Sequence, residues 1–274
     1  MAERSLLITG CSSGIGACCA AGMQARGWRV IATARKPQDI EGLKAQGLDA
    51  LYLDYTEPDS ITQCAQEALA LTGGRLGALF NNGAYGQPGA VEDIETPVLR
   101  EQFEANFFGW HDLTRQLIPA MRRNGGGRIV QNSSILGLVS LKYRGAYNAS
   151  KFAVEGLSDA LRQELKGTGI HVSIIEPGPI ATRFSENALA AYRANVDTAN
   201  SPHREVYEQR MAAMEAGAPT PLSQGPEAVL SKLIHALESR FPHPRYYVTL
   251  PTHALGLGRR LLSTRMLDFL MSNE

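Results

Sequence analysis

Short apolar runs alternate with helix-length segments along most of this sequence, and this alternation constrains the fold more than any other feature. The runs contain few polar residues, which is typical of parallel strands that are covered on both faces. With right-handed crossover connections, the pattern predicts an α/β fold with a doubly wound sheet of about seven parallel strands flanked by helices. The predicted strands are Leu6–Thr9, Arg29–Ala34, Ala50–Asp54, Leu76–Asn81, Arg128–Ser133, His171–Glu176 and Tyr246–Leu250.

The segments between these runs have the length and apolar spacing of helices. The predicted helices include Gly14–Arg26, Pro58–Leu71, Pro97–Arg123 and Ala146–Lys166.

The alternation stops after the sixth strand. Residues 182–225 are rich in Ala, Asn, Glu and Arg and contain no strand pattern, but they have helical patches at Ser185–Asn195 and His203–Ala216. We predict one domain over residues 1–274, in which 182–225 form a substrate-binding lid and 252–274 a C-terminal extension. The alternative for 182–225 is a surface helical pair without function.

Charge and hydropathy exclude several kinds of partner. The chain has 27 basic and 27 acidic side chains, so it has no net charge to attract a polyanion, and no nucleic acid is expected. No window holds the roughly 18 uncharged apolar residues of a spanning helix, so no stable membrane insertion is expected. The start MAERSLLITG lacks the features of a signal peptide, and the cysteines and histidines show no disulfide or metal-ligand spacing. We therefore expect a cytoplasmic protein with reduced thiols and no metal.

The C-terminal stretch Leu255–Met271 is amphipathic. It places Arg259, Arg260 and Arg265 among leucines. We expect this stretch to pack on the lid or on a partner subunit, with peripheral membrane contact as the alternative.

The first strand runs directly into a turn with the glycine spacing G-x3-G-x-G, which opens the first helix. Gly10 permits a tight turn, Gly14 lets the backbone approach a pyrophosphate, and Gly16 lets helix and strand pack closely. Phosphates would then lie at the positive end of the helix. A plain structural turn is the alternative, and the flanking strand and helix argue against it. The predicted dinucleotide-binding residues are Gly10, Ser12, Ser13, Gly14, Ile15 and Gly16.

The end of the second strand distinguishes the two nicotinamide cofactors. An acidic residue at this place would accept hydrogen bonds from the ribose hydroxyls of NAD and repel an additional phosphate. The sequence has Arg35 and Lys36 there and no carboxylate. Because a guanidinium binds a phosphate through two parallel hydrogen bonds, this pair predicts NADP(H); a solvated strand end is the alternative.

Three polar residues form a candidate catalytic set. Ser134 follows the fifth strand, and Tyr147 and Lys151 lie near the start of the next helix. Tyr147 and Lys151 are four residues apart, so they share one helix face at about 5 to 6 Å. A Tyr-x3-Lys pair alone is common on exposed helix faces. Ser134, thirteen residues upstream and downstream of a dinucleotide turn, makes the set specific.

Taken together, these motifs resemble those of the short-chain dehydrogenase/reductase family over nearly the whole chain, which implies a Rossmann-type sheet. Within that family, the sequence is similar to NADP(H)-dependent hydroxysteroid and retinol dehydrogenases and to bacterial carbonyl and aldehyde reductases. The residues that carry the resemblance are Thr9–Gly16, Asp54, Asn81–Ala84, Asn106, Ser134, Tyr147–Lys151 and Pro177–Thr182.

The resemblance implies a catalytic role for four residues. Tyr147 would donate a proton to the carbonyl oxygen during reduction, and Ser134 would hold that oxygen by a hydrogen bond. Lys151 would lower the pKa of Tyr147 by its charge and hold the nicotinamide ribose, and Asn106 would anchor a water that relays protons to Lys151.

The resemblance also implies further cofactor contacts. Gly83 lies in a stretch that reads Asn-Asn-Gly-Ala where the family usually has Asn-Asn-Ala-Gly, so we expect a small backbone adjustment there. Asn81 would stabilise the central sheet beside the cofactor. The additional cofactor residues implied are Asp54, Asn81, Gly83, Tyr147, Lys151, Pro177, Gly178, Ile180 and Thr182.

We therefore predict an NADP(H)-dependent oxidoreductase that moves hydride between the nicotinamide and a carbonyl or alcohol. Apolar residues near the site favour an apolar small molecule such as an aldehyde, ketone, retinoid or steroid; packing of the core is the alternative explanation for these residues. Family habit implies a homodimer or homotetramer in which the long helices pair. The alternatives are a catalytically silent NADP(H) sensor or scaffold, and a sugar-nucleotide epimerase. The predicted substrate-binding residues are Ser134, Leu136, Tyr143, Tyr147 and Phe184.

Overall fold

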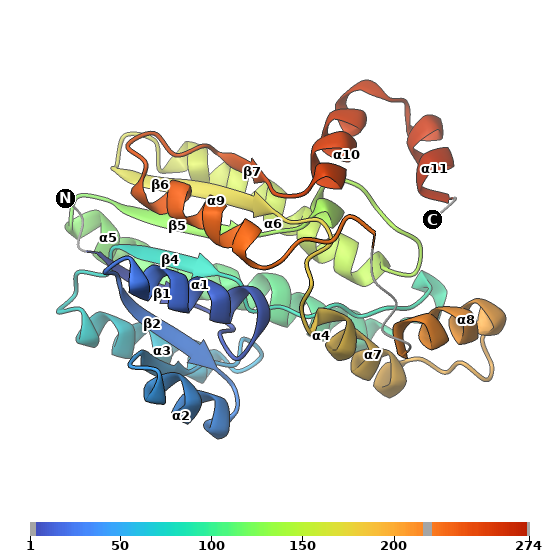
Figure 1. The fold of residues 1–274 in the computed structure, drawn as a ribbon, viewed down its shortest axis with the longest axis horizontal. Helices are drawn as coiled ribbons and strands as arrows, with labels where there is room; N and C mark the ends of the chain where they lie inside the picture. The colour runs from blue at the N-terminus through green and yellow to red at the C-terminus, as the bar shows by residue number, and fades with distance from the viewer. Residues whose placement is uncertain (1–3, 216–220, 273–274) are drawn as a thin grey trace.

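The structure is a computed structural model that describes residues 4–215 and 221–272. Seven parallel strands form one sheet in the order β3-β2-β1-β4-β5-β6-β7, which confirms the predicted doubly wound, Rossmann-type architecture (Figure 1). The strand order reverses between β1 and β4, and in such sheets this place opens a crevice at the carboxyl ends of the strands. The strands are β1 Ser5–Ile8, β2 Arg29–Ala34, β3 Asp49–Tyr52, β4 Ala78–Asn81, β5 Gly127–Asn132, β6 Ile170–Glu176 and β7 Arg245–Tyr247.

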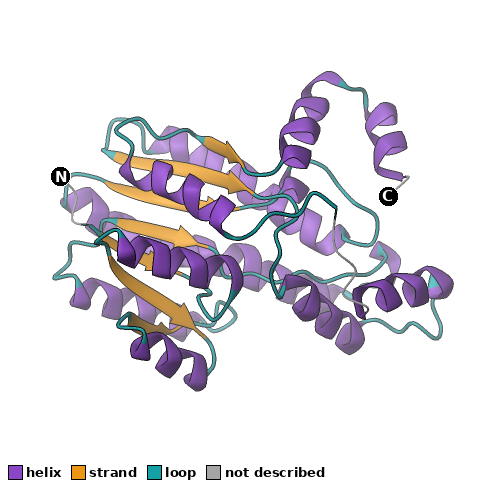
Figure 2. Ribbon diagram, in the orientation of Figure 1, coloured by secondary structure: helices purple, strands orange, loops and turns teal. Residues whose placement is uncertain are grey.

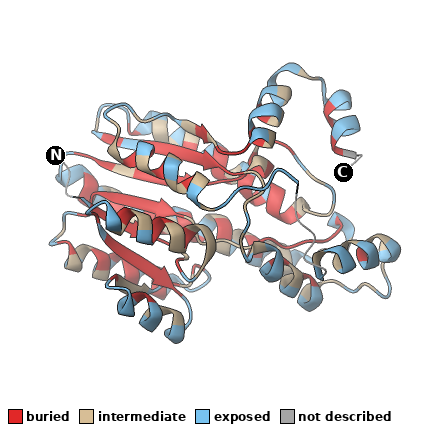
Figure 3. Cartoon of the chain, in the orientation of Figure 1, coloured by how far each residue is buried: buried red, intermediate tan, exposed pale blue. Residues whose placement is uncertain are grey.

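Helices cover both faces of the sheet (Figure 2). On one face, a core that includes Met23, Leu43 and Leu233 lies under α1, α2 and α9. On the other face, a core that includes Ile61, Trp110 and Val154 lies under α3, α5 and α6. The central strands are buried between these layers (Figure 3), which explains why they are apolar on both sides. The helices are α1 Gly14–Ala25, α2 Pro37–Ala45, α3 Pro58–Leu71, α5 Gly109–Arg123, α6 Gly145–Glu164 and α9 Glu227–Glu238.

The structure divides two segments that the sequence presents as continuous. The predicted helix Pro97–Arg123 consists of α4 (Thr96–Phe103), the π-helical turn η2 (Glu104–Phe108) and α5. The predicted strand Tyr246–Leu250 ends at Tyr247, because Leu250 already begins α10 with Pro251 in its first turn.

Two helices, α7 (Phe184–Asn195) and α8 (Arg204–Glu215), fill most of the predicted lid. Their inner faces pack on a small cluster with Ala90, Tyr192 and Tyr207. They lie beyond the carboxyl ends of the strands in Figure 1. The predicted helix end Ala216 and the lid residues up to 220 lie outside the described residues, as do 1–3 and 273–274 of the predicted domain.

The C-terminal stretch forms two helices, α10 (Leu250–Leu261) and α11 (Thr264–Ser272), which stand apart from α7 and α8 in Figure 1. Of the two expected arrangements, packing on the lid is therefore not seen for the described lid helices, and packing on a partner subunit stays a prediction. Instead, α10 packs against η3, the short turn Ile135–Gly137 that follows β5. Within the described part of the chain, no helix is long and apolar enough to cross a membrane.

Candidate active site

The glycine turn after β1 is held against the turn after β4. Gly10 and Gly14 have φ of +69° and +58°, a region that side chains with a Cβ rarely adopt. A Cβ on Gly10 would lie 2.5 Å from the Cα of Gly83, and one on Gly16 would lie 2.1 Å from the carbonyl oxygen of Gly10. Glycine at position 10 therefore lets the two turns meet, whereas a Cβ on Gly83 would make only a tight contact, 3.3 Å from the backbone nitrogen of Gly10.

The N-terminus of α1 has the chemistry of a phosphate site. Its cap residue, Ser13, makes no capping hydrogen bond with its side chain, and the first turn contains no acidic residue. The backbone N–H groups there remain available, and the helix dipole favours an anion. A Cβ on Gly14 would lie 3.1 Å from the side chain of Thr182, so the turn after β6 faces this helix end. This cradle fits the pyrophosphate of a dinucleotide.

The cationic pair after β2 lies at the rim of the same edge. Arg35 is largely exposed, and its Nη1 is 3.7 Å from Oδ2 of Asp54. Asp54 also accepts hydrogen bonds from the backbone N–H and the hydroxyl of Thr56. Lys36 is the N-cap residue of α2. The structure thus brings the predicted residues Arg35, Lys36 and Asp54 together. Because the ion pair between Arg35 and Asp54 is long and Arg35 is exposed, guanidinium N–H donors remain for a phosphate.

Two asparagines at the ends of neighbouring strands connect the glycine turn to the predicted catalytic residues. The Asn82 amide donates to the carbonyl oxygen of Thr9 at 2.9 Å, and its own oxygen accepts from the Asn132 amide at 2.9 Å. The carbonyl oxygen of Asn132 accepts from Nζ of Lys151 at 2.8 Å. Sequence reasoning did not single out Asn132. The available signal was an asparagine at the carboxyl end of the strand beside β4.

Ser134, Tyr147 and Lys151 meet at the carboxyl ends of β5 and β6. Tyr147 and Lys151 are buried on one face of α6, as their spacing predicts, and Nζ of Lys151 is 5.6 Å from the centroid of the Tyr147 ring. The hydroxyl of Ser134 accepts from the backbone N–H of Leu136 at 3.1 Å and forms a hydrogen bond with Tyr147. The Lys151 ammonium also lies 4.3 Å from the centre of a ring of Trp110.

Burial controls the protonation of this group. It raises the pKa of Tyr147 to about 12, although the hydrogen bond from Ser134 and the charge of Arg144 act in the opposite direction. Burial also lowers the pKa of Lys151 to about 7, and the charge of Glu155 opposes this shift. Lys151 thus loses its proton before Tyr147 does, and the lowering of the Tyr147 pKa by the charge of Lys151 stays a prediction.

Arg144 is a residue that sequence reasoning missed. It precedes α6 as its N-cap residue, three positions before Tyr147, and it is the cation whose charge lowers the Tyr147 pKa. Burial lowers the pKa of Arg144 itself, and its Nη1 is buried without a hydrogen-bond partner among the described residues. The available signal was a cation one helical turn before the tyrosine.

Asn106 and Asn81 use their side chains within the protein. Asn106 lies in η2, where its amide donates to the carbonyl oxygen of Tyr85 at 2.8 Å and to the hydroxyl of Ser150 at 3.3 Å. It therefore joins the segment after β4 to the residue beside Lys151. Asn81 bonds to Tyr55, Thr114 and Gln131 in the core, which is the sheet-stabilising position that the sequence predicts.

The turn after β6 reaches the same edge of the sheet. The carbonyl oxygen of Pro177 accepts from the backbone N–H of Ile135 at 2.7 Å, next to Ser134. A Cβ on Gly178 would lie 2.1 Å from Oγ1 of Thr249, so glycine is needed for this approach. Ile180 forms an isolated bridge with Gln224 across the lid segment.

The predicted substrate residues divide into two groups. The ring of Phe184, at the start of α7, meets the ring of Tyr147 edge to face at 5.4 Å, and Leu136 is buried beside Ser134. Tyr143 packs instead on His203 and Tyr207 of the lid, and its φ is +61°. The structure therefore brings Phe184 and Leu136 to Ser134 and Tyr147, and uses Tyr143 to support α8.

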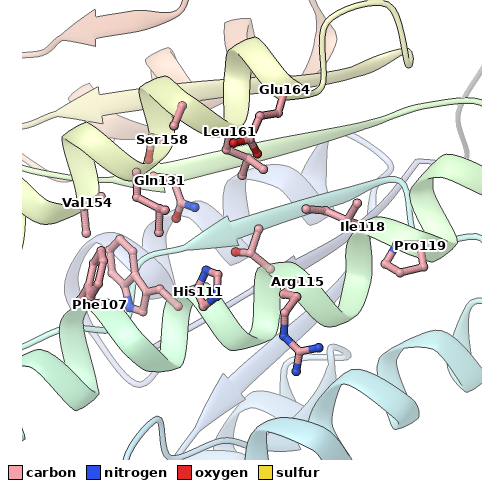
Figure 4. Close-up of a pocket in the computed structure, with 14 residues that line it drawn as sticks. Phe107, His111, Arg115, Ile118, Pro119, Gln131, Val154, Ser158, Leu161 and Glu164 are labelled. Atoms are coloured by element: carbon pink, nitrogen blue, oxygen red, sulfur yellow. The ribbon is translucent and has the colours of Figure 1, made fainter.

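A groove of about 290 Å³ lies between α5 and α6, away from Ser134 and Tyr147 (Figure 4). Its walls are mostly apolar, and Gln131 of β5 forms part of its floor. Trp110 separates the groove from Lys151. The lining includes Phe107, Trp110, Ile118, Val154, Leu157 and Leu161. Across the described ranges, no three His, Cys, Asp or Glu side chains are placed to hold a metal ion.

Comparison with known proteins gives consistent matches. A family model described as short chain dehydrogenase matches residues 4–193. The uncharacterized oxidoreductase YbbO of Escherichia coli K12 is 43% identical over 266 residues, which cover 97% of this chain and 93% of YbbO. Human retinol dehydrogenase 8 is 35% identical over 199 residues, which cover 69% of this chain and 63% of that enzyme. A short-chain dehydrogenase from Streptomyces avermitilis has a similar solved structure, with a TM-score of 0.80, 30% identity and coverage of 99% and 97% of the two chains.

Proposed function

The chain belongs to the short-chain dehydrogenase/reductase family of oxidoreductases, and we propose that it uses NADP(H) to interconvert a carbonyl group and an alcohol. The observation that carries this proposal is the meeting of Ser134, Tyr147 and Lys151 at the sheet edge that also holds the glycine turn. A binding-only protein would not require a buried phenol beside a buried amine, which argues against a silent sensor or scaffold.

Each residue has a defined task in reduction. A bound nicotinamide would supply a hydride to the carbonyl carbon. Tyr147, which keeps its proton because burial raises its pKa, donates that proton to the carbonyl oxygen, so the product is a neutral alcohol. Ser134 donates a hydrogen bond that fixes the same oxygen. Lys151 would hold the ribose and, with a pKa of about 7, return a proton to Tyr147 through a water. Because the side chain of Asn106 is bonded to Tyr85 and Ser150, the backbone of Asn106 would anchor that water.

The choice of NADP(H) rests on Arg35 and Lys36. The glycine turn and Thr182 would hold the pyrophosphate, and the exposed Arg35 guanidinium would bind the 2′-phosphate with Lys36 beside it. Arg35→Asp should raise the KM for NADPH far more than the KM for NADH. Equal effects on both cofactors would refute the assignment.

An apolar substrate fits the surroundings of Tyr147. Phe184 and Leu136 are the predicted substrate residues that lie next to Tyr147 and Ser134, and both are apolar. The relative named retinol dehydrogenase 8 acts, by its name, on an apolar alcohol. Aldehydes, ketones, retinoids and steroids are the classes to test first.

A direct assay tests the function. Purified protein is mixed with NADPH and a panel of aldehydes and ketones, and the nicotinamide absorbance is followed. We expect turnover in the wild type and its loss in Tyr147→Phe, with NADPH binding retained in both proteins. Turnover that is unchanged in Tyr147→Phe would disprove the mechanism, and binding without turnover in the wild type would favour the sensor.

We also propose the wider organisation of the protein. Residues 1–274 would act as one domain in the cytoplasm, with 182–225 as the substrate lid and 252–274 as a C-terminal extension. The apolar groove between α5 and α6 supports a homodimer or homotetramer in which these helices pair with those of a second copy. Light scattering on Leu157→Glu, a change at the groove wall, tests this by the loss of the oligomer.

A further inference from the structure

The two C-terminal helices expose an apolar stripe to solvent. Six of the thirteen large apolar side chains that are exposed in the described residues lie within 250–272. On α10 they lie at positions i, i+7 and i+11, and on α11 at positions i, i+3 and i+4. Each helix therefore carries one outward apolar face. The six residues are Leu250, Leu257, Leu261, Met266, Phe269 and Leu270.

The opposite face of each helix is occupied by the protein. Thr252 and Gly256 of α10 are buried, and so are Leu267 and Met271 of α11. The outward apolar residues are therefore additional to those that hold the helices in place. Figure 3 shows the largely exposed surface of these helices, which project from the body of the molecule. We call residues 250–272 the C-terminal arm.

The arm is positively charged in a protein that has no net charge. It contains Arg259, Arg260 and Arg265 against the single acidic residue Asp268, a formal charge of 3 − 1 = +2. The three arginines surround the connection between α10 and α11, beside the exposed Leu261 and Met266. Apolar side chains interleaved with arginines are the pattern of helices that lie in the interface of an anionic membrane.

A second copy of the chain fits this surface less well. A symmetric pairing would place the arginines of one arm near those of the other, and like charges in one interface repel each other. An anionic lipid surface instead neutralises the arginines while its acyl region accepts the leucines and Phe269.

The arm is fixed to the active site. The first turn of α10 lies against the turn after β6, where the Oγ1 of Thr249 approaches Gly178 so closely that a Cβ there would be at 2.1 Å. The same helix packs on η3, directly after Ser134. In Figure 1 the arm stands at the end of the molecule to which the strands point. Ser134 follows β5 at this carboxyl end of the sheet.

We propose that the C-terminal arm docks the protein peripherally on an anionic lipid surface, with its helices lying in the interface and not crossing the bilayer. Docking then holds the carboxyl edge of the sheet near the membrane, where apolar molecules concentrate. The docking stands independently of the catalytic assignment, and only the delivery of an apolar substrate from the membrane rests on the proposed function.

Vesicle co-sedimentation of the full chain tests the docking without cofactor or substrate. We expect the wild type to sediment with vesicles of phosphatidylcholine and phosphatidylglycerol, to bind pure phosphatidylcholine vesicles more weakly, and to be released by high salt. Replacing the three arginines by Gln should lower the partition coefficient on the anionic vesicles by about 100-fold. The triple change Leu257→Gln, Leu261→Gln and Phe269→Gln should abolish binding to both kinds of vesicle.

Phe241→Gln provides the matched control, because Phe241 is as exposed as Phe269 but lies outside the arm. This variant should sediment like the wild type. The folded state of every variant is checked by circular dichroism and by turnover of a water-soluble aldehyde, which the arm changes should leave intact. If turnover is absent in all proteins, the proposed function fails while the vesicle result still stands.

Two outcomes would overturn the docking. One is a wild type that stays in the supernatant with anionic vesicles at low salt. The other is an arm variant that sediments like the wild type. If the arm variants change the oligomer mass in light scattering and the wild type does not bind vesicles, the arm is a contact between subunits and the proposal is wrong.

Discussion

The buried ammonium of Lys151 donates a 2.8 Å hydrogen bond to the backbone carbonyl oxygen of Asn132 at the end of β5. Through Asn82, the same asparagine is connected to the glycine turn after β1. The amine is thus held between the predicted cofactor site and Tyr147. Its pKa of about 7 shows that burial outweighs the nearby charge of Glu155.

Lys151→Met should change how the stability depends on pH. In the folded wild type Lys151 is neutral above about pH 7, whereas in the unfolded chain it keeps its proton up to about its ordinary pKa of 10.5. The unfolded state then binds more protons between these values, so the wild-type stability rises with pH in this window. As the pH rises through this window, the free energy of unfolding of the methionine variant should therefore fall relative to that of the wild type, by at most about 1.4 kcal/mol per pH unit. Urea unfolding at several pH values measures this, and parallel curves for both proteins would contradict it.

Arg144→Met should slow alcohol oxidation near neutral pH. The Arg144 cation lowers the pKa of Tyr147, so its removal raises that pKa and leaves less phenolate to act as the base. We expect about a tenfold loss in the oxidation rate near neutral pH and a shift of the pH profile to higher pH. Arg162→Met, which removes a surface cation near the other end of α6, is the control. If the pH profile of the oxidation rate is unchanged in both variants, Arg144 does not act on Tyr147.

Gly16→Ala should destabilise the fold and weaken cofactor binding, because the new Cβ would lie 2.1 Å from the carbonyl oxygen of Gly10. The backbone must shift at the phosphate turn, at a cost of about 1 to 3 kcal/mol. Gly42→Ala is the matched control, since nothing lies within 4 Å of a Cβ there, and this change inside α2 should stabilise the protein by about 0.5 to 1 kcal/mol. Thermal unfolding and NADPH fluorescence titration measure both effects. Equal shifts in the two variants would argue against the steric explanation.

Arg245→Met should be strongly destabilising. The guanidinium pairs with Glu155, Asp159 and Glu176, so its loss leaves carboxylates buried without a cation, at about 3 to 5 kcal/mol. Burial and the charge of Glu155 already raise the pKa of Glu176 to about 8.

Because its pKa is raised, Glu176 binds a proton more tightly in the folded state than in the unfolded chain. This proton stabilises the fold at low pH, and the stabilisation is lost as the pH rises toward 8. Denaturant unfolding should therefore show a larger loss for Arg245→Met at pH 8 than at pH 5. The exposed pair of Arg193 with Glu215 gives the control, since Arg193→Met should change the stability by less than about 1 kcal/mol. A loss that does not change with pH would point to packing alone.

The parallel strands and the positions of the motifs were predictable because both depend on local sequence. A buried parallel strand must be apolar on both faces, and a phosphate turn must have glycine where the backbone takes positive φ or meets another chain segment. The predicted helix Pro58–Leu71 and strand Arg29–Ala34 therefore agree with the structure residue for residue. The division of Pro97–Arg123 was not predictable, because the π turn at Asn106 is stabilised by the carbonyl of Tyr85, twenty-one residues away.

The sequence by itself determined the doubly wound sheet, the glycine turn, and the Ser134, Tyr147 and Lys151 set, since each depends on residue type at a fixed spacing. Tertiary structure alone decided the protonation of that set, because burial is a property of the packed chain and it outweighs the hydrogen bond and the charge that lower the pKa of Tyr147. It also decided that the charge of Arg144 acts on Tyr147 and which side of the C-terminal helices remains in solvent. Periodicity identifies an apolar face, but only packing shows whether another part of the protein covers it.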